Sequence, residues 1–351
     1  MKAYLLKDIG EFFFEDVGDL VPEKSEVVVS VKATGICGSD ISRIYKSGTY
    51  SYPLIPGHEF SGIVTEIGEG VEKDWIGKRV GIFPLIPCQE CKPCIQKKYE
   101  MCRNYNYLGS RKDGGFAEKV KVPVWNLLKL PDEVSYVQAA MLEPMSVAVH
   151  AMKSIDLKDN NRVAIYGLGT IGLFLLMFLK ERGISDVIVI GNKDIQKDQA
   201  LRFGVLEECF FDSRTGDATE WLECMNVDRE IDVFFECVGR NEIVSEVVNY
   251  TGPGGKIVII GNPASDMTLD KQTYWKILRN QLTIIGTWNS SYCQCNENDW
   301  QYVLDKLKNG RIHPEYMITH KFDFEDLLQG FELMRDKSEE YVKVLGVCNK
   351  L

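Results

Sequence analysis

The sequence predicts an α/β protein with two domains, one rich in short β-strands and one built on a doubly wound parallel sheet. Three observations support this prediction. The chain has 351 residues, which corresponds to about two domains at the usual length per domain. Between residues 162 and 288, strands alternate with helices, the pattern of a parallel sheet. Before residue 130, short β-branched segments are separated by glycines, as in a small barrel.

Composition limits the possible partners and location. Hydrophobic residues make up 45% of the chain and charged residues 26%, which is typical of a globular protein. A net charge of −10 argues against binding to nucleic acid or to an anionic membrane. No apolar run is long enough to cross a bilayer. The first residues, MKAYLLKDIG, lack the apolar region of a signal peptide, so we expect a cytoplasmic protein.

The β-rich region contains two motifs with metal-binding side chains. The segment Val27–Gly35 is predicted to be a strand, and it leads into CGSD, which carries Cys37. About twenty residues later, GHEFSG carries His58 and Glu59. A thiolate, an imidazole and a carboxylate suit a catalytic zinc, which keeps one position open for water or substrate. The sequence alone leaves open whether these residues meet around one ion.

A second metal-binding pattern follows in PCQECKPCIQKKYEMC. Cys88, Cys91, Cys94 and Cys102 have the spacing C-x2-C-x2-C-x7-C, which predicts a zinc held by four thiolates. Such a zinc has no open position, so its expected role is to stabilise a lobe that has little core of its own. The alternative is four free cysteines in a loop. The CxC pair formed by Cys293 and Cys295 has no partner cysteines nearby, and we expect free thiols there.

The segment from Leu130 to Ser154 reads as a helix with an interruption at Pro144. Glu143 comes directly before this proline in an otherwise apolar stretch. Burial of a lone carboxylate is costly unless the group is paired or bound to a metal. Judged from the residues alone, a carboxylate at a helix end facing water is the better interpretation of Glu143.

Residues 162–183 carry the pattern of a dinucleotide-binding loop. A predicted strand is followed by G-L-G-T-I-G and then by an apolar helix, which is the context that this motif requires. Gly167 makes the tight turn, Gly169 lets the backbone approach a pyrophosphate, and Gly172 lets the helix pack closely on the sheet. The helix N-terminus favours phosphate binding. The alternative is a plain glycine turn.

Further strands are predicted at Asp186–Gly191, Lys256–Gly261 and Leu282–Trp288, with helices between them. We therefore place a Rossmann domain at residues 156–286 and the β-rich domain at residues 1–155. The tail, residues 287–351, is too short to be a domain and is expected to return to the β-rich one.

The motifs CGSD, GHE, the four-cysteine lobe, LEP and GLGTIG occur in this order along essentially the whole chain. Together they resemble the zinc-dependent medium-chain dehydrogenase/reductase family, in its polyol-dehydrogenase branch. The stretches CGSDISRIYKSG, YPLIPGHEFSG, YLGSRKDGGFAE and WKILRNQLTIIGTW are similar to members that act on alditol phosphates. The resemblance implies a GroES-like catalytic domain, a Rossmann domain, an active-site cleft between them, and a homodimer or homotetramer.

The resemblance also implies a ligand set and a reaction. Cys37 and His58 are implied ligands of a catalytic zinc, Glu59 is a ligand or near-ligand, and Glu143 is the fourth protein group. The implied reaction transfers hydride between a secondary alcohol and nicotinamide, with zinc as the Lewis acid. With the four-cysteine site, two zinc ions per chain are expected.

The chain matches the proton relay of the family at only one of two positions. Ser39 matches the position that begins the proton relay in the family, although a helix-capping role is the alternative. Many members carry a histidine where this chain has Ser42. We therefore hypothesise that Glu59, acting through water, continues the relay.

The expected cofactor is a nicotinamide dinucleotide. At the end of the second Rossmann strand, NAD-specific proteins usually carry an acidic residue, but this chain has Gly191 followed by Asn192 and Lys193. A 2′-phosphate would meet less repulsion there, so NADP(H) is favoured over NAD(H), although Asp194 could still serve NAD. The expected cofactor-binding residues are Gly167, Gly169, Thr170, Ile171, Gly172, Asn192, Lys193, Cys237, Val238 and Gly261.

The expected substrate is a polyol or sugar phosphate. Arg43, with Arg111 as a further candidate, is the hypothesised phosphate anchor, because arginine offers a planar fork of donors. The alternative for each is a solvated surface cation. Trp288 and Asn289 are expected to line the cleft, although Trp288 could equally belong to a domain interface. The alternatives are a dehydrogenase of free polyols or vicinal diols, and a non-catalytic nucleotide-binding relative, against which the intact zinc ligands argue.

Overall fold

The computed structural model of the chain describes residues 1–263, 265–295 and 297–348. These residues form two compact units, and the predicted α/β class is confirmed. One unit comprises Met1–Ser146 and Ser290–Leu351, and the other comprises Val147–Asn289. The sequence places the same division at residues 155/156 and 286/287. Helix α4 (Leu142–Lys153) crosses the first boundary of the structure.

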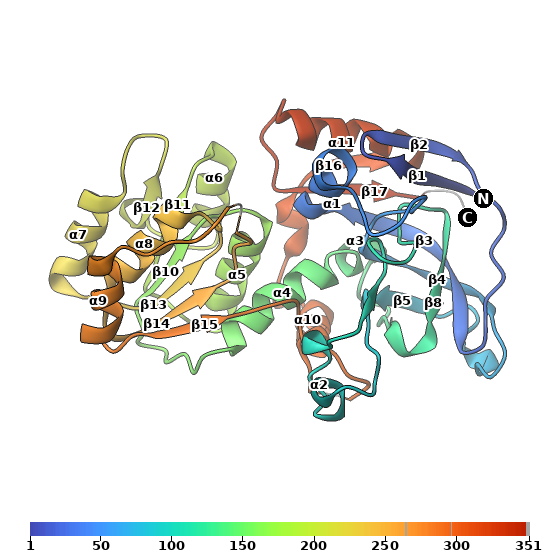
Figure 1. The fold of residues 1–351 in the computed structure, drawn as a ribbon, viewed down its shortest axis with the longest axis horizontal. Coiled ribbons are helices and arrows are strands. Elements are labelled where there is room, and N and C mark those ends of the chain that lie inside the picture. The colour runs from blue at the N-terminus through green and yellow to red at the C-terminus, as the bar shows by residue number, and fades with distance from the viewer. Residues whose placement is uncertain (264, 296, 349–351) are drawn as a thin grey trace. The chain divides into compact units, whose positions relative to one another are not determined.

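The unit Val147–Asn289 contains a six-stranded sheet in which every neighbouring pair of strands is parallel. The strands are β10 (Val163–Tyr166), β11 (Val187–Gly191), β12 (Phe210–Asp212), β13 (Ile231–Glu236), β14 (Thr251–Ile259) and β15 (Thr283–Gly286). The helices are α5 (Thr170–Glu181), α6 (Asp194–Arg202), α7 (Thr219–Asp228), α8 (Asn241–Tyr250) and α9 (Lys271–Arg279). Strands β10 and β11 are buried along their whole length, because helices cover both faces of the sheet (Figure 1).

The strand order places the glycine loop beyond the carboxyl end of β10, in the middle of this sheet. The order is β12-β11-β10-β13-β14-β15, so the direction of chain progression reverses between β10 and β13. Helices α5 and α6 lie on one face, and α7, α8 and α9 on the other (Figure 1). In such sheets, ligands bind beyond the carboxyl ends of the strands at the point of reversal. The loop that contains Gly167 and Gly169 follows β10 at this point.

The unit Met1–Ser146 with Ser290–Leu351 is built on a mostly antiparallel sheet of seven strands, ordered β16-β17-β3-β4-β5-β9 with β8 also paired to β3. The strands of this unit are β1 (Lys2–Asp8), β2 (Glu11–Asp16), β3 (Glu26–Ile36), β4 (Glu59–Ile67), β5 (Arg79–Ile82), β6 (Leu85–Ile86), β7 (Asn106–Tyr107), β8 (Lys119–Pro123), β9 (Leu127–Lys129), β16 (Ile318–Asp323) and β17 (Lys343–Val347). The last two come from the tail, which pairs with β3 through β17. Buried side chains of β3, β4, β5 and β8 form a core that consists mostly of valines.

Short helices complete this unit. They are α1 (Gly38–Ser42), α2 (Lys92–Ile95), α3 (Tyr136–Ala139), α10 (Asp299–Lys308) and α11 (Leu327–Asp336), besides the start of α4. The lobe around α2 projects from the rest of the unit (Figure 1). No helix in the described part of the chain is long and apolar enough to cross a membrane.

The predicted interruption at Pro144 is wrong. Helix α4 begins at Leu142, so Pro144 lies in its first turn. The first N–H groups of a helix have no partner within the helix, and a proline costs little there. The break lies earlier, between α3 and α4. This start places Glu143 in the first turn of α4.

Candidate active site

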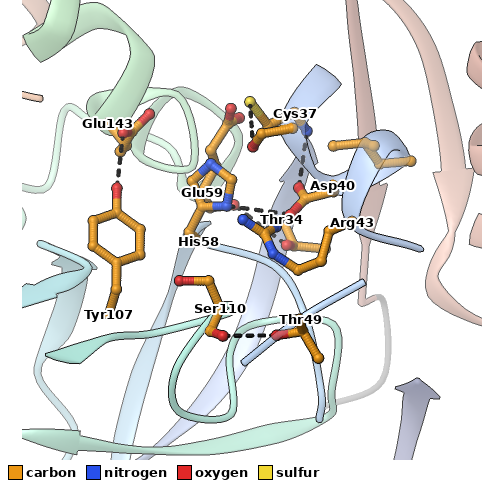
Figure 2. Close-up of polar contacts among 12 residues, drawn as sticks. Thr34, Cys37, Asp40, Arg43, Thr49, His58, Glu59, Tyr107, Ser110 and Glu143 are labelled. Atoms are coloured by element: carbon orange, nitrogen blue, oxygen red, sulfur yellow. Dashed lines mark hydrogen bonds and ion pairs between the residues drawn. The ribbon is translucent and has the colours of Figure 1, made fainter. Parts of the chain in front are cut away.

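Three of the predicted metal ligands converge in the β-rich unit. Ligand atoms of Cys37, His58 and Glu59 all lie within 4.8 Å of one another. Figure 2 shows the three side chains gathered beside Asp40 and Arg43. His58 and Glu59 are buried, and Cys37 is partly exposed. The thiol of Cys37, the imidazole of His58 and the carboxylate of Glu59 fit a zinc site that keeps one coordination position open.

The pairing of β3 with β4 brings these residues together. In the antiparallel register, Gly35 of β3 lies opposite Glu59, the first residue of β4. Cys37 follows β3 directly and is the N-cap of α1. His58 precedes β4, after Gly57, which has a φ of +97°. A side chain at Gly57 would lie within 3 Å of the Phe116 ring, so only glycine fits this turn.

Asp40 is a buried carboxylate behind the imidazole of His58, and the sequence interpretation gave it no role. Its Oδ1 atom lies 3.3 Å from His58 Nδ1 and accepts a 2.7 Å hydrogen bond from Arg43 Nη1. Its Oδ2 atom accepts a 3.1 Å bond from the backbone N–H of Cys37. Burial would raise the pKa of Asp40, but His58, Arg43 and this N–H outweigh burial and lower it. An acid three residues after Cys37, in CGSD, was the available signal.

The same carboxylate favours the charged form of His58. Burial alone would lower the pKa of His58, but Asp40 outweighs this effect and raises the pKa well above its ordinary value. A metal must therefore displace a proton from this ring. A carboxylate that holds one ring nitrogen fixes the tautomer and orientation of a metal-binding histidine.

Glu143 is held differently from the other three predicted ligands. It is 8% exposed and accepts a 3.3 Å hydrogen bond from the phenol of Tyr107 (Figure 2). Burial, with a contribution from the nearby Glu59 carboxylate, raises the pKa of Glu143 to about 7. Burial also raises the pKa of Tyr107, so the phenol stays protonated and can donate. The interpretation of Glu143 as a water-facing carboxylate is wrong, because α4 begins early enough to bury it.

Lys343 is a second residue that the sequence interpretation missed. Its ammonium forms an ion pair with Glu59 and donates a 3.1 Å hydrogen bond to the carbonyl oxygen of Ile36. Both partners of the ion pair are 1% exposed. The available signal was a lysine inside the apolar strand YVKVLGV, although nothing local indicates its partner.

Ser39, the expected start of the proton relay, lies beside the thiol of Cys37. Its Oγ atom is 3.3 Å from Cys37 Sγ and donates to it. The N-cap of α1 is Cys37, so Ser39 does not cap this helix. Its hydroxyl is exposed.

The residues predicted to bind substrate lie in three different settings. Arg43 is held by Asp40, and its side chain is 17% exposed. The Arg111 guanidinium lies 4.3 Å from the ring centroids of both Tyr50 and Tyr105 and borders a cavity of about 300 Å³. The other two predicted residues, Trp288 and Asn289, end the second unit, and Trp288 is 57% exposed.

The four-cysteine lobe has the dimensions of a closed zinc site. Neighbouring sulfur atoms lie between 3.4 and 3.9 Å apart. Four sulfurs placed tetrahedrally at about 2.3 Å from a zinc would be separated by about 3.8 Å. Backbone N–H groups of Arg103 and Cys94 lower the pKa of Cys91 to about 6, which favours its thiolate form. The donor set and its dimensions fit a structural zinc.

The expectation for the CxC pair is wrong. The sulfurs of Cys293 and Cys295 form a disulfide, and the two Cα atoms are 5.2 Å apart, within the range that a disulfide requires. Two cysteines separated by a single residue can pair with each other, so no further cysteine is needed nearby.

In the second unit, the glycine loop has a left-handed turn at Gly167 and a close backbone contact at Gly172. Gly167 has a φ of +96°. A side chain at Gly172 would collide with the carbonyl oxygen of Gly167. Gly169, the N-cap of α5, has open space where a side chain would be. A side chain at Gly167 would also lie 2.6 Å from Val238, which follows Cys237. Predicted cofactor residues that follow β10 and β13 are therefore neighbours.

The predicted cofactor-specificity position lies at the end of β11. The backbone N–H of Asn192 donates to Gln196, and Lys193 is the N-cap of α6. Asp194 forms an ion pair with Arg214, which also binds Asp212 at the end of β12. The sequence interpretation missed Arg214, which lies far from this position along the chain.

Comparisons with known proteins identify the family. Residues 23–132 match the alcohol dehydrogenase GroES-like domain, and residues 170–309 match the zinc-binding dehydrogenase family. The chain is 32% identical to galactitol 1-phosphate 5-dehydrogenase of Escherichia coli K12 over 315 residues, covering 90% of each chain. It is 26% identical to sorbitol dehydrogenase of Bacillus subtilis, over 100% of this chain and 98% of that protein.

Solved structures agree with this match. The crystal structure of galactitol-1-phosphate dehydrogenase from Escherichia coli is 31% identical with a TM-score of 0.91, covering 99% of this chain and 100% of that one. An alcohol dehydrogenase of Escherichia coli CFT073 complexed with NADH is 30% identical, with a TM-score of 0.89 over 99% of both chains. A zinc-binding dehydrogenase of Sinorhizobium meliloti bound to NADP is 27% identical, with a TM-score of 0.88 over 99% of this chain and 98% of that one.

The family models cover the two metal-binding patterns and most of the second unit, and the structural matches, over 99% of the chain, also span the glycine loop. They confirm the resemblance on which the functional expectations rest. The chain belongs to the zinc-dependent medium-chain dehydrogenase/reductase family, in its polyol-dehydrogenase branch, and is an alcohol dehydrogenase that uses a nicotinamide cofactor.

Proposed function

We propose that the protein interconverts an alditol phosphate and a ketose phosphate, by hydride transfer between a secondary alcohol and NAD(P). The substrate would be a hexitol or pentitol phosphate. The observation that carries the proposal is the convergence of Cys37, His58 and Glu59 within 4.8 Å. The similarity to galactitol 1-phosphate 5-dehydrogenase supports a phosphorylated substrate.

In this proposal, Cys37, His58, Glu59 and Glu143 serve the catalytic zinc, which supplies Lewis acidity towards an alcohol oxygen. The chain itself orients these groups and moves the proton. Asp40 holds the His58 ring, and Tyr107 holds Glu143. Ser39, exposed beside Cys37, is proposed to take the first proton. Glu59 stays the hypothesised next group of the relay, and its carboxylate is 1% exposed and ion-paired with Lys343.

Arg43 and Arg111 are the proposed anchors of the substrate phosphate. The bond to Asp40 uses one of the five N–H donors of the Arg43 guanidinium. Because Asp40 also contacts His58, removing Arg43 would disturb the zinc site as well as phosphate binding. Arg111 is the cleaner test, because its guanidinium lies against Tyr50 and Tyr105 and donates to the Tyr105 carbonyl oxygen, and neither tyrosine is a proposed zinc ligand. We keep Trp288 and Asn289 as proposed substrate contacts.

The test is to measure initial rates with phosphorylated and free C4–C6 polyols for the wild type, Arg111→Gln and the neighbouring control Lys112→Gln. We expect the highest kcat/KM for a phosphorylated alditol. Arg111→Gln should raise KM for that substrate and leave KM for the free polyol unchanged. Equal effects on both substrates would contradict the phosphate role.

The free-polyol alternative is favoured by the similarity to sorbitol dehydrogenase. It predicts that the unphosphorylated polyols give the higher kcat/KM and that Arg111→Gln has no selective effect. A non-catalytic nucleotide-binding role predicts no turnover of any polyol with either cofactor.

For the cofactor we propose the glycine loop, Asn192, Lys193, Cys237, Val238 and Gly261 as the binding residues, and a preference for NADP(H). The absence of an acid at Gly191 supports this preference. The ion pair between Arg214 and Asp194 supports the NADP(H) preference further, because Asp194 is the alternative ligand for an NAD ribose. The ratio of kcat/KM for NADP⁺ and NAD⁺ tests the preference, and a higher value for NAD⁺ would contradict it.

A homodimer or homotetramer is proposed on the basis of an exposed apolar surface in the second unit. Strand β15 ends the sheet, and its Ile284 is 44% exposed. Tyr274, Trp275 and Leu278 of α9 are between 44% and 59% exposed. Exposed apolar edge strands favour association. Light scattering of the wild type and Ile284→Lys tests this, with a smaller assembly expected for the variant.

We propose a cytoplasmic location, which cell fractionation would test.

A further inference from the structure

Lys343 forms a closed ionic contact directly behind the proposed catalytic zinc site. Its ammonium and the Glu59 carboxylate are an ion pair in which each side chain is 1% exposed. The carbonyl oxygen of Ile36 accepts a second bond from the same ammonium, at 3.1 Å. The partners are 284 residues apart in the chain, so the tail of the protein supplies this cation.

Strand β3 lies between the two partners and leaves room for them. Val344 of β17 pairs with Ile36 on one side of β3, and Glu59 of β4 pairs with Gly35 on the other. A side chain at Gly35 would collide with Glu59 Oε2 and would lie 2.9 Å from Lys343 Cε. The glycine therefore forms the space in which the pair meets.

Stability alone does not account for this pair. Removing two charges from water is costly, and apolar residues of similar volume often stabilise a fold as well or better. Strand β17 is otherwise apolar and buried, so an apolar residue at position 343 would suit its surroundings. The ion pair also adjoins the proposed zinc site. A carboxylate oxygen of Glu59 lies within 4.8 Å of the Cys37 sulfur and of a ring nitrogen of His58.

We propose that Lys343 is a positioning residue of the catalytic metal site, an inference that rests on the proposed zinc site above. It fixes the Glu59 carboxylate beside Cys37 and His58. It also offsets one negative charge in a site where the Cys37 thiolate and the Glu59 and Glu143 carboxylates would together outweigh a divalent cation. The site with zinc is then neutral instead of negative, which favours binding of an alcohol in its more anionic form.

The test measures zinc retention per chain against increasing chelator in the full-length protein, together with the visible spectrum after cobalt(II) substitution. Lys343→Met is expected to lose the zinc of this site at about 10- to 100-fold lower chelator concentration. Its cobalt absorption bands should also shift. Lys343→Arg keeps the charge and is expected to behave like the wild type. Unchanged retention and an unchanged spectrum in Lys343→Met would overturn the proposal.

A second comparison keeps the test decisive if Lys343→Met folds poorly. Because Lys343 acts through Glu59, zinc retention in Glu59→Gln/Lys343→Met should equal that in Glu59→Gln alone, and an additional loss would overturn the proposal. Both charges are absent in this double variant, so no buried charge is left unpaired. Cys37→Ser separates the two claims. If it retains all zinc and the wild-type spectrum, the zinc site itself is wrong, whatever Lys343 does.

Discussion

Asp40 lies 3.3 Å from the Nδ1 atom of His58 and leaves Nε2 as the ring nitrogen available to a metal. The carboxylate is fully buried, and Arg43 and the Cys37 backbone hold it from the other side. The Asp40 carboxylate therefore contacts His58, the backbone N–H of Cys37 at the N-terminus of α1, and the guanidinium of Arg43.

Replacing Asp40 by Asn should weaken the catalytic zinc site. The amide keeps the shape but loses the charge that orients His58, and such changes typically lower metal affinity about 10- to 100-fold. Competition with a chromogenic chelator measures the affinity. Asp132→Asn, at an exposed position, is the control and should match the wild type. A zinc affinity equal in both variants would show that Asp40 does not support His58.

Two glycines of the cofactor loop should respond differently to the same added methyl group. Gly169→Ala has open space in the protein, so its free energy of unfolding should change by less than about 0.5 kcal/mol. The methyl would nevertheless occupy the approach to the pyrophosphate, and binding of NADPH followed by fluorescence should weaken strongly.

Gly172→Ala should instead destabilise the protein, by about 1–3 kcal/mol, because its methyl would collide with the Gly167 carbonyl. Denaturant unfolding of both variants measures the difference. Equal losses of stability at the two positions would contradict the assigned roles of these glycines.

Replacing Cys102 by Ser should remove the structural zinc and leave the catalytic one. The remaining three thiolates lose the closed tetrahedral arrangement, and the lobe around α2 depends on the metal for its order. Metal analysis should fall from two zinc ions per chain to one, with a lower melting temperature. Cys224→Ser, at an exposed cysteine, should keep both ions. Loss of both zinc ions, or of none, in Cys102→Ser would be inconsistent with a separate structural site.

Arg214→Ala should reduce the use of NADP⁺ selectively. The guanidinium lies beside the end of β11, where the 2′-phosphate is proposed to bind, and a hydrogen bond to a charged group contributes about 1.5–3 kcal/mol. The kcat/KM for NADP⁺ should therefore fall roughly tenfold or more, with little change for NAD⁺. Asp194→Asn is the matched control, since it removes one of the two carboxylates that hold the guanidinium, leaves Asp212 as the other, and should not reduce NADP⁺ use. An equal loss with both cofactors in Arg214→Ala would refute the assignment.

The fold was largely predictable because its signals are local. The alternation of strands and helices, with glycines at the ends of strands, is sufficient to predict the parallel sheet of the second unit. The error at Pro144 arose because a proline within an apolar helical pattern was read as a break. The first turn of a helix tolerates proline, and only the true start of α4 at Leu142 reveals that position.

The candidate site was predictable only as far as its residues carry short motifs. Cys37, His58 and the four-cysteine lobe lie in such motifs, but Lys343 does not. A lysine in a strand is ordinarily expected to face water, and its burial depends on a carboxylate 284 residues away. Tyr107 was missed for the same reason, because its partner Glu143 lies on a different element.

Cys37, His58 and Glu59 are proposed to form a catalytic zinc site. Its most direct test measures zinc content and the initial rate of NAD(P)H formation from an alditol phosphate, for the wild type and Cys37→Ser. The wild type should contain two zinc ions per chain and turn over the substrate. Cys37→Ser should contain one zinc ion, remain folded and show no measurable rate. A variant that keeps both zinc ions and the wild-type rate would contradict the claim.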